Sequence, residues 1–222
     1  RDAWLYGRWD VFEGQFFPEF DTSTHLCKPA EIPKNVTVFI SLDYGLDMLA
    51  GYWIAVDPFE NAYVYREVYK SGLIISEAAR TIIDAQRNDI PEMYIAPPDM
   101  WNRRQDSGKS GFEVMQSVPG MPPMCAADNR RVPGWRVLRE YLQPAEGAPV
   151  LRISSVCTEL IRSMPALLCD ALRPEDASDE PHAVTHAPEA LRYAAMSRAK
   201  ESIPAERPDN NFRFAKKERS LF

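Results

Sequence analysis

The chain has 222 residues, 45% of them apolar and 26% charged, and a formal net charge of −6. A chain of this length and composition can bury one substantial core, so we expect a single compact domain with ragged ends. No apolar run approaches the roughly 18 to 20 residues needed to span a bilayer, and the first residues lack the layout of a secretory signal, which predicts a cytoplasmic protein with no membrane partner.

The negative net charge bears on the partners. Proteins that bind nucleic acids usually carry a basic face that neutralises phosphates, so composition alone argues mildly against DNA. A cation site weakens this objection, because its clustered carboxylates add negative charge that bound ions offset. The cysteines lack CxxC pairing, which argues against a zinc site and favours free thiols. They are Cys27, Cys125, Cys157 and Cys169.

The first segment, residues 1–33, is rich in aromatic and loop-forming residues and shows neither a helical nor a strand period. We expect it to be the tail of something that precedes the domain. His25 and His182 are expected to be plain surface residues.

Three strands are predicted next. A β-branched apolar run over 36–42 ends at Asp43, and strand candidates follow over 51–56 and 62–69. The turn-forming residues 57–61 separate the last two. Together these strands predict an antiparallel meander.

A helix and a fourth strand follow the meander. Residues 75–87 carry apolar residues at helical spacing, and a strand is predicted over 93–96. Two prolines stop that strand and present Asp99 just past its carboxyl end, where sheets with parallel pairs usually carry their chemistry. The elements expected after this are a helix over 111–117, a strand over 124–127, a helix over 134–142, a strand over 150–153 and a helix over 158–168.

The C-terminal part begins with an acidic, loop-like stretch, residues 170–187. A final helix is predicted over 188–201, with a proline in its first turn and Glu189 near its positive end. Residues 202–222 are polar, interrupted by prolines and slightly basic, and we expect a mobile tail.

Three carboxylates stand out in this layout. Each lies where a strand ends or the last helix begins: Asp43, Asp99 and Glu189. Carboxylates at such positions can come together and bind divalent cations, which is the least that metal-dependent phosphodiester hydrolysis requires. The order of elements is that of ribonuclease H-like folds, although a generic mixed domain shares it. The predicted fold class is α/β, with a ribonuclease H-like mixed sheet (an antiparallel three-strand meander plus parallel strands) flanked by helices.

Four stretches resemble the nuclease domain of the large terminase subunit of tailed bacteriophages and prophages. They are AWLYGRWDVFEGQFFPEFD, SLDYG, ADNRRVPGWRVLREYL and HAPEALRYA. One departure concerns the third carboxylate, because the family usually has aspartate where Glu189 stands. Asp176 and Asp179, in the loop before it, remain alternative ligands.

The resemblance implies a division of the chain and a function. Residues 1–33 would be a linker or the tail of an upstream ATPase domain, 34–201 the nuclease domain and 202–222 the tail. The implied activity is endonucleolytic cutting of double-stranded concatemeric viral DNA, with little sequence dependence, during packaging in the bacterial cytoplasm. Implied partners are the portal protein, the small terminase subunit and the upstream ATPase domain, since the motor's GxxxxGK[ST] loop does not occur here.

The implied chemistry uses two Mg²⁺ or Mn²⁺ ions. Asp43 would bridge ions roughly 4 Å apart, Asp99 would complete the shell of one ion, and Glu189 or Asp179 that of the other. His186 would orient water, donate to the leaving oxygen or hold a carboxylate. The ordinary alternatives are turn residues for the two aspartates, a favourable helix-dipole contact for Glu189 and a cap for His186.

Several basic residues flank the candidate site in sequence and are expected to contact phosphates, with solvated or ion-paired surface roles as the alternative. They are Arg103, Arg104, Lys109, Arg130, Arg131 and Arg136. Arg192 is expected to pair with a carboxylate beneath the site. For Trp101 and Trp135, core packing is favoured over stacking on bases.

Two other functions fit the same residues. One is another ribonuclease H-like enzyme, of the resolvase or transposase type, which the terminase-like opening disfavours. The other is a non-catalytic docking module for the portal or small terminase subunit, with merely structural carboxylates. Metal-dependent cleavage of DNA would distinguish a nuclease of either type from a docking module.

Overall fold

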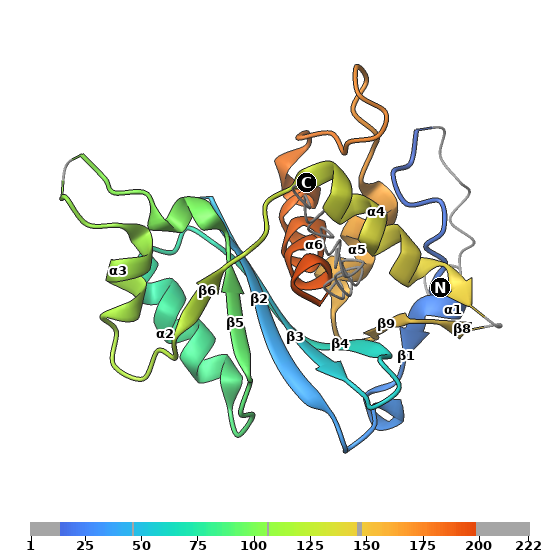
Figure 1. Ribbon diagram of the computed structural model, residues 1–222, viewed down its shortest axis with the longest axis horizontal. Helices are drawn as coiled ribbons and strands as arrows, with labels where there is room; N and C mark the ends of the chain where they lie inside the picture. The colour runs from blue at the N-terminus through green and yellow to red at the C-terminus, as the bar shows by residue number, and fades with distance from the viewer. Residues whose placement is uncertain (1–13, 46, 106, 146–147, 199–222) are drawn as a thin grey trace, which may run out of the picture.

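A mixed seven-stranded sheet with helices on both faces forms the centre of the computed structural model (Figure 1). The structure describes residues 14–45, 47–105, 107–145 and 148–198. The strand order is β1-β9-β4-β3-β2-β5-β6. The strands are β1 (Leu26–Cys27), β2 (Thr37–Tyr44), β3 (Met48–Val56), β4 (Ala62–Ser71), β5 (Met93–Ala96), β6 (Met124–Ala126) and β9 (Leu151–Ser154), with β7 (Pro144–Ala145) and β8 (Ala148–Pro149) as a separate pair.

The central strands form the predicted meander. β2 pairs antiparallel with β3, and β3 pairs antiparallel with β4. On one side of the meander, β5 runs parallel to β2 and β6 parallel to β5; on the other, β9 runs parallel to β4 and β1 parallel to β9. The predicted fold class, a mixed sheet flanked by helices, is therefore confirmed.

The helices lie in two groups. α2 and α3 cover one face of the sheet, and α4, α5 and α6 cover the other (Figure 1). Their bounds are α1 (Thr22–His25), α2 (Ile75–Gln86), α3 (Gly111–Gln116), α4 (Arg131–Leu142), α5 (Thr158–Ala166) and α6 (His186–Arg198), with short 3-10 turns η1 (Pro29–Glu31), η2 (Pro98–Trp101) and η3 (His182–Val184). None of these described helices has the length and apolar character needed to cross a bilayer.

Two helices begin earlier than predicted. α4 begins at Arg131 and α6 at His186, so Pro133 and Pro188 lie in their first turns. Proline is tolerated there because the first N–H groups of a helix have no acceptor within it. The end of the predicted last helix and the predicted tail, residues 199–222, lie outside the described residues.

Alternation along β2 divides its side chains between the two faces. Ile40 and Leu42 are fully buried against the α2 and α3 side. Ser41 points the other way, and its hydroxyl donates to the carbonyl of Ala190 in α6 at 2.6 Å. Because side chains two apart in a strand share a face, Asp43 lies on the α6 side as well.

Trp135 of α4 is the centre of the core on that side and is 1% exposed. Its ring makes edge contacts with Phe16 and Phe17, at centroid distances of 5.4 and 5.9 Å. The preceding Gly134 allows α4 to approach α6 closely, because a Cβ added there would lie 2.7 Å from Cγ of Arg192. The expectation that Trp135 packs in the core is therefore confirmed.

The described part of the N-terminal segment, residues 14–33, packs on the domain that follows it. Phe16, Phe17 and Phe20 join the core beside α4 and α5, and β1 extends the sheet. His25 is 1% exposed, with Nε2 2.8 Å from the carbonyl oxygen of Leu142, so its expected surface position is wrong. The apolar residues of this segment follow neither a helical nor a strand spacing, because its backbone is largely irregular and is held to the core by single aromatic side chains.

The turn between β3 and β4 yields a prediction about pH. Asp57, 8% exposed, accepts hydrogen bonds from the backbone N–H groups of Phe59 and Asn61 and from the Asn61 side chain, at 2.8 to 2.9 Å. Burial raises the pKa of Asp57, but these hydrogen bonds outweigh it and hold the pKa below 3.8. Asp57→Asn is expected to lower the free energy of unfolding by about 1 kcal/mol near pH 7, since bonds to a charged acceptor are the stronger ones.

The sign of the pH dependence follows from the direction of the shift. A depressed carboxyl pKa stabilises the fold above the unfolded-state value and loses that contribution as the pH falls through the folded-state value. The gap between wild type and Asp57→Asn should therefore close below pH 3.8. Urea unfolding over a pH series measures this difference in unfolding free energy, with the exposed Asp84→Asn as control. A difference that stays constant with pH would contradict the depressed pKa of Asp57.

Candidate metal centre

Neighbouring parallel strands bring Asp43 and Asp99 to the same edge of the sheet. The β2–β5 ladder aligns Ser41 with Ile95, so Asp43 lies just beyond the paired residues and Asp99 follows in η2. Partial burial raises the pKa of Asp99, and the negative charge of Asp43 raises it further. The two carboxylates therefore interact electrostatically.

The first turn of α6 adds His186 and Glu189 to this edge. His186 Nδ1 lies 2.8 Å from Oδ2 of Asp43, and this contact raises the pKa of the imidazole. Tyr193, one turn after Glu189, has its pKa raised by burial and then by Asp43, Glu189 and Asp99 in turn. One phenol thus senses all three carboxylates that the sequence singled out.

Glu189 is held by two arginines. Its Oε1 accepts from Nε of Arg131 at 2.9 Å, and its Oε2 pairs with Nη2 of Arg192 at 2.6 Å. Burial raises the pKa of Glu189; the two guanidinium groups oppose this rise, and Asp43 adds to it. Both carboxylate oxygens face guanidinium groups, so a metal ion bound here would share a carboxylate oxygen with an arginine or displace that arginine. The expected pairing of Arg192 with a carboxylate is observed.

The two alternative ligands in the acidic loop differ from each other. Asp179 is 68% exposed and pairs with Nη1 of Arg131 at 2.6 Å. Asp176 is buried and accepts a hydrogen bond from the indole N–H of Trp135 at 2.9 Å. Nε of Arg131 lies 3.3 Å from Asp176 as well, so this guanidinium joins three carboxylates. Asp176 thus connects the acidic loop to the core, whereas Asp179 lies at the surface.

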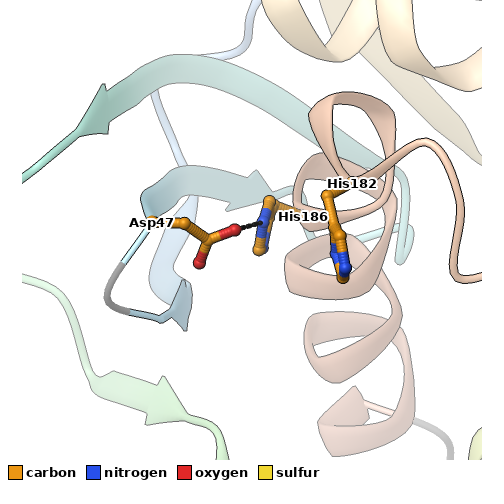
Figure 2. A group of neighbouring side chains, drawn as sticks. All are labelled: Asp47, His182 and His186. Carbon is orange, nitrogen blue, oxygen red and sulfur yellow. Dashed lines mark hydrogen bonds and ion pairs between the residues drawn. The ribbon is translucent and has the colours of Figure 1, made fainter.

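The sequence reasoning did not single out Asp47, in the β2–β3 turn. Its Oδ2 lies 3.0 Å from Nε2 of His186 (Figure 2), whereas Asp43 contacts the other ring nitrogen, Nδ1. His182, at the start of η3, lies beside the same ring, and one ligand atom from each of Asp47, His182 and His186 falls within 4.8 Å of the others. The His-x-x-x-His spacing was the available signal, but no local pattern pointed to Asp47.

The predicted phosphate contacts fall into three groups. Arg103 and Arg104 line a pocket of about 270 Å³ together with Asp99, and Lys109 lies in the same loop, where its carbonyl accepts from the N–H of Arg104. Arg130 is exposed and pairs with Asp128 at 2.6 Å, whereas Arg136 is exposed on α4. Arg131 forms the third group, because its side chain is only 25% exposed and its guanidinium contacts three carboxylates. Trp101 stacks on a neighbouring phenylalanine, in line with a packing role.

Comparison with known proteins extends these findings. No protein-family model and no curated protein matches the chain. Among solved structures, the large terminase of a thermophilic bacteriophage in complex with ADP superposes with a TM-score of 0.66 at 18% identity, covering 85% of this chain and 46% of the terminase. The chain thus spans about half the length of that protein.

Two isolated nuclease domains match over nearly their whole length. The large terminase nuclease domain of bacteriophage SPP1, solved with bound Mn, gives a TM-score of 0.56 at 16% identity, with 80% of this chain and 96% of the domain covered. The large terminase nuclease of thermophilic phage G20c, solved with bound magnesium, gives 0.57 at 8% identity, with coverages of 83% and 97%. The chain therefore has the ribonuclease H-like fold of the nuclease domains of phage large terminases.

Proposed function

We propose that this chain is a metal-dependent DNA endonuclease, the nuclease domain of a phage large terminase. The observation that carries the proposal is the geometry at one sheet edge: Asp43 and Asp99 follow neighbouring parallel strands, and the first turn of α6, which carries Glu189, contacts Asp43 through His186 at 2.8 Å. Charged groups of one sign are costly to gather unless something offsets them. A fold shared with terminase nucleases solved with bound Mn and magnesium supports the same reading.

The residues present suit divalent cations that prefer oxygen ligands. Asp43 and Asp99 offer carboxylates whose mutual repulsion a cation would relieve, and Asp99 also lines a pocket of about 270 Å³ together with Arg103 and Arg104. Two Mg²⁺ or Mn²⁺ ions bound there would lower the pKa of an attacking water and stabilise the developing charge on the leaving oxygen. Asp43 would hold both ions, Asp99 one, and Glu189 or Asp179 the other.

The remaining side chains would position the substrate and the ligands. His186, hydrogen-bonded to Asp43, would hold that carboxylate in place or orient a water molecule. Arg103, Arg104 and Lys109 lie on the Asp99 side of the centre and would neutralise DNA phosphates, with Arg130 and Arg136 as further contacts. These contacts go to the backbone of DNA, so cutting would depend little on sequence.

The biological setting is part of the same proposal. The substrate would be double-stranded concatemeric viral DNA, cut during packaging in the host cytoplasm. An ATPase domain would precede residue 34, and the portal protein and small terminase subunit would be partners. The large terminase that the chain matches over about half of that protein's length supports this setting.

Metal removal tests the activity. Purified protein with Mn²⁺ or Mg²⁺ is expected to nick and linearise plasmid DNA; EDTA should stop the reaction and an excess of Mn²⁺ restore it. Agarose electrophoresis measures both steps. Intact plasmid at every metal concentration, with DNA or a partner protein still bound, would favour a docking module instead.

The third carboxylate can be tested separately. Glu189→Gln is expected to impair cleavage more than Asp179→Asn, because Glu189 is 15% exposed and coupled to Asp43, whereas Asp179 is 68% exposed. Initial rates at saturating Mn²⁺ make the comparison, with melting temperatures to confirm folding. The reverse order would move the third ligand into the acidic loop.

A further inference from the structure

We propose a second metal site, formed by Asp47, His182 and His186, that takes a transition-metal dication of the Zn²⁺ class. It lies next to the hydrolytic centre but differs from it in ligand chemistry. Imidazole nitrogens favour Zn²⁺, Co²⁺ and Ni²⁺, whereas the all-oxygen set of Asp43 and Asp99 favours Mg²⁺ and Mn²⁺. The cysteines argued against a zinc site, but this one uses none of them.

The three ligand atoms are already gathered. They lie within 4.8 Å of one another, and the closest pair, Nε2 of His186 and Oδ2 of Asp47, is 3.0 Å apart. Ligands around a tetrahedral ion with bonds of about 2.0 to 2.1 Å are separated by roughly 3.3 Å. The His186–Asp47 pair therefore nearly fits, and His182, whose side chain is 65% exposed, has room to approach.

The orientation of His186 supports this assignment. Metal-bound histidines usually donate their second ring N–H to a carboxylate, which fixes the tautomer and the direction of the ring. Here Nδ1 of His186 lies 2.8 Å from Oδ2 of Asp43, which leaves Nε2 to face Asp47, while the His182 ring stacks beside the His186 ring with 6.2 Å between centroids (Figure 2). The ring is 12% exposed, so it is held by its surroundings and is not a freely rotating surface group.

The three ligands come from different elements, so a bound ion would connect these elements. Asp47 belongs to the β2–β3 turn, His182 to η3 and His186 to the first residue of α6. An ion bound to all three would link the sheet edge that carries Asp43 to the beginning of α6. Three protein ligands leave at least one coordination position for water.

Calorimetric titration of the protein with Zn²⁺, without DNA and in an excess of Mg²⁺, tests the site. One Zn²⁺ per chain is expected, with affinity lowered more than about tenfold in His182→Ala and in Asp47→Asn. The exposed Glu175→Gln, in the same acidic loop, is the matched control and should bind as wild type does. Co²⁺ serves as a second probe, since its visible absorption reports nitrogen ligands and should disappear in His182→Ala.

Asp99→Asn separates the two centres. It should leave Zn²⁺ binding intact, because Asp99 is a ligand only of the hydrolytic centre. Absence of Zn²⁺ binding, or unchanged affinity in both ligand variants, would overturn the proposal. Binding that is lost in Asp99→Asn but retained in His182→Ala would place the ion in the hydrolytic centre and overturn it equally. No step measures cleavage, so the result does not depend on the nuclease activity.

Discussion

Asp43→Asn is expected to lower the rate of plasmid cleavage by a factor on the order of 10³ or more. The carboxylate lies 2.8 Å from Nδ1 of His186, its charge raises the pKa of Asp99, and it is the one proposed to hold both ions. Replacing it with an amide removes a negative charge from the place where the ions bind. Loss of several kcal/mol of transition-state stabilisation corresponds to a rate factor of this size. Single-turnover cleavage at saturating Mn²⁺ measures the effect.

The fold of Asp43→Asn should survive. The substitution weakens the contact with His186, but it also removes the repulsion that raises the pKa of Asp99, so the two changes in stability have opposite signs. We expect a melting temperature close to that of wild type. Asp84→Asn, at an exposed position of α2, is the control for a neutral surface change. Wild-type cleavage by purified Asp43→Asn would show that the activity belongs to another site or to a contaminant.

Trp135→Ala is expected to lower the free energy of unfolding by about 3 to 5 kcal/mol, the usual cost of emptying a large aromatic site in a core. The ring packs against Phe16 and Phe17, and the Arg192 guanidinium lies 5.2 Å from its centroid. The substitution also removes the indole N–H that donates to the buried Asp176. Thermal and urea unfolding measure the loss, which corresponds to a drop in Tm of roughly 10 °C for a domain of this size.

Trp101→Ala provides a matched comparison. Trp101 stacks on Phe112 at 4.6 Å between centroids but is only partly buried, so its removal should cost clearly less stability. Equal losses in the two variants would contradict the central role assigned to Trp135. Greater loss in Trp101→Ala would move the main core to the other face of the sheet.

The central sheet was predictable because its signals are local. The β-branched run before Asp43 and the two prolines before Asp99 are readable in a few residues, and β2 and β5 lie where these patterns place them. The parallel pairing of β1 with β9 joins residues more than a hundred positions apart, and two-residue strands leave almost no pattern. Local sequence therefore identified the meander but not β1, the edge strand beside β9.

The candidate site was only partly readable for a similar reason. Acidic residues at strand ends are visible in sequence, and in the structure Asp43 and Asp99 follow neighbouring parallel strands, with the first turn of α6 beside Asp43. Tertiary packing decides which cationic side chain each acid contacts: Arg131, which we expect to contact DNA, pairs with Asp179 and Glu189. Asp47 was missed because nothing about a turn residue reveals that a histidine 139 positions away will face it.

The packing of residues 14–33 on the domain determines where the chain can be cut to produce a stable fragment. Cutting before residue 34, where the sequence alone would place the boundary, removes Phe16 and Phe17 from beside Trp135 and strips β1 from β9. The first loss opens a hole in the core; the second leaves unpaired the backbone groups of β9 that face away from β4, a template for aggregation. A soluble fragment should therefore retain the chain from at least residue 14 onward.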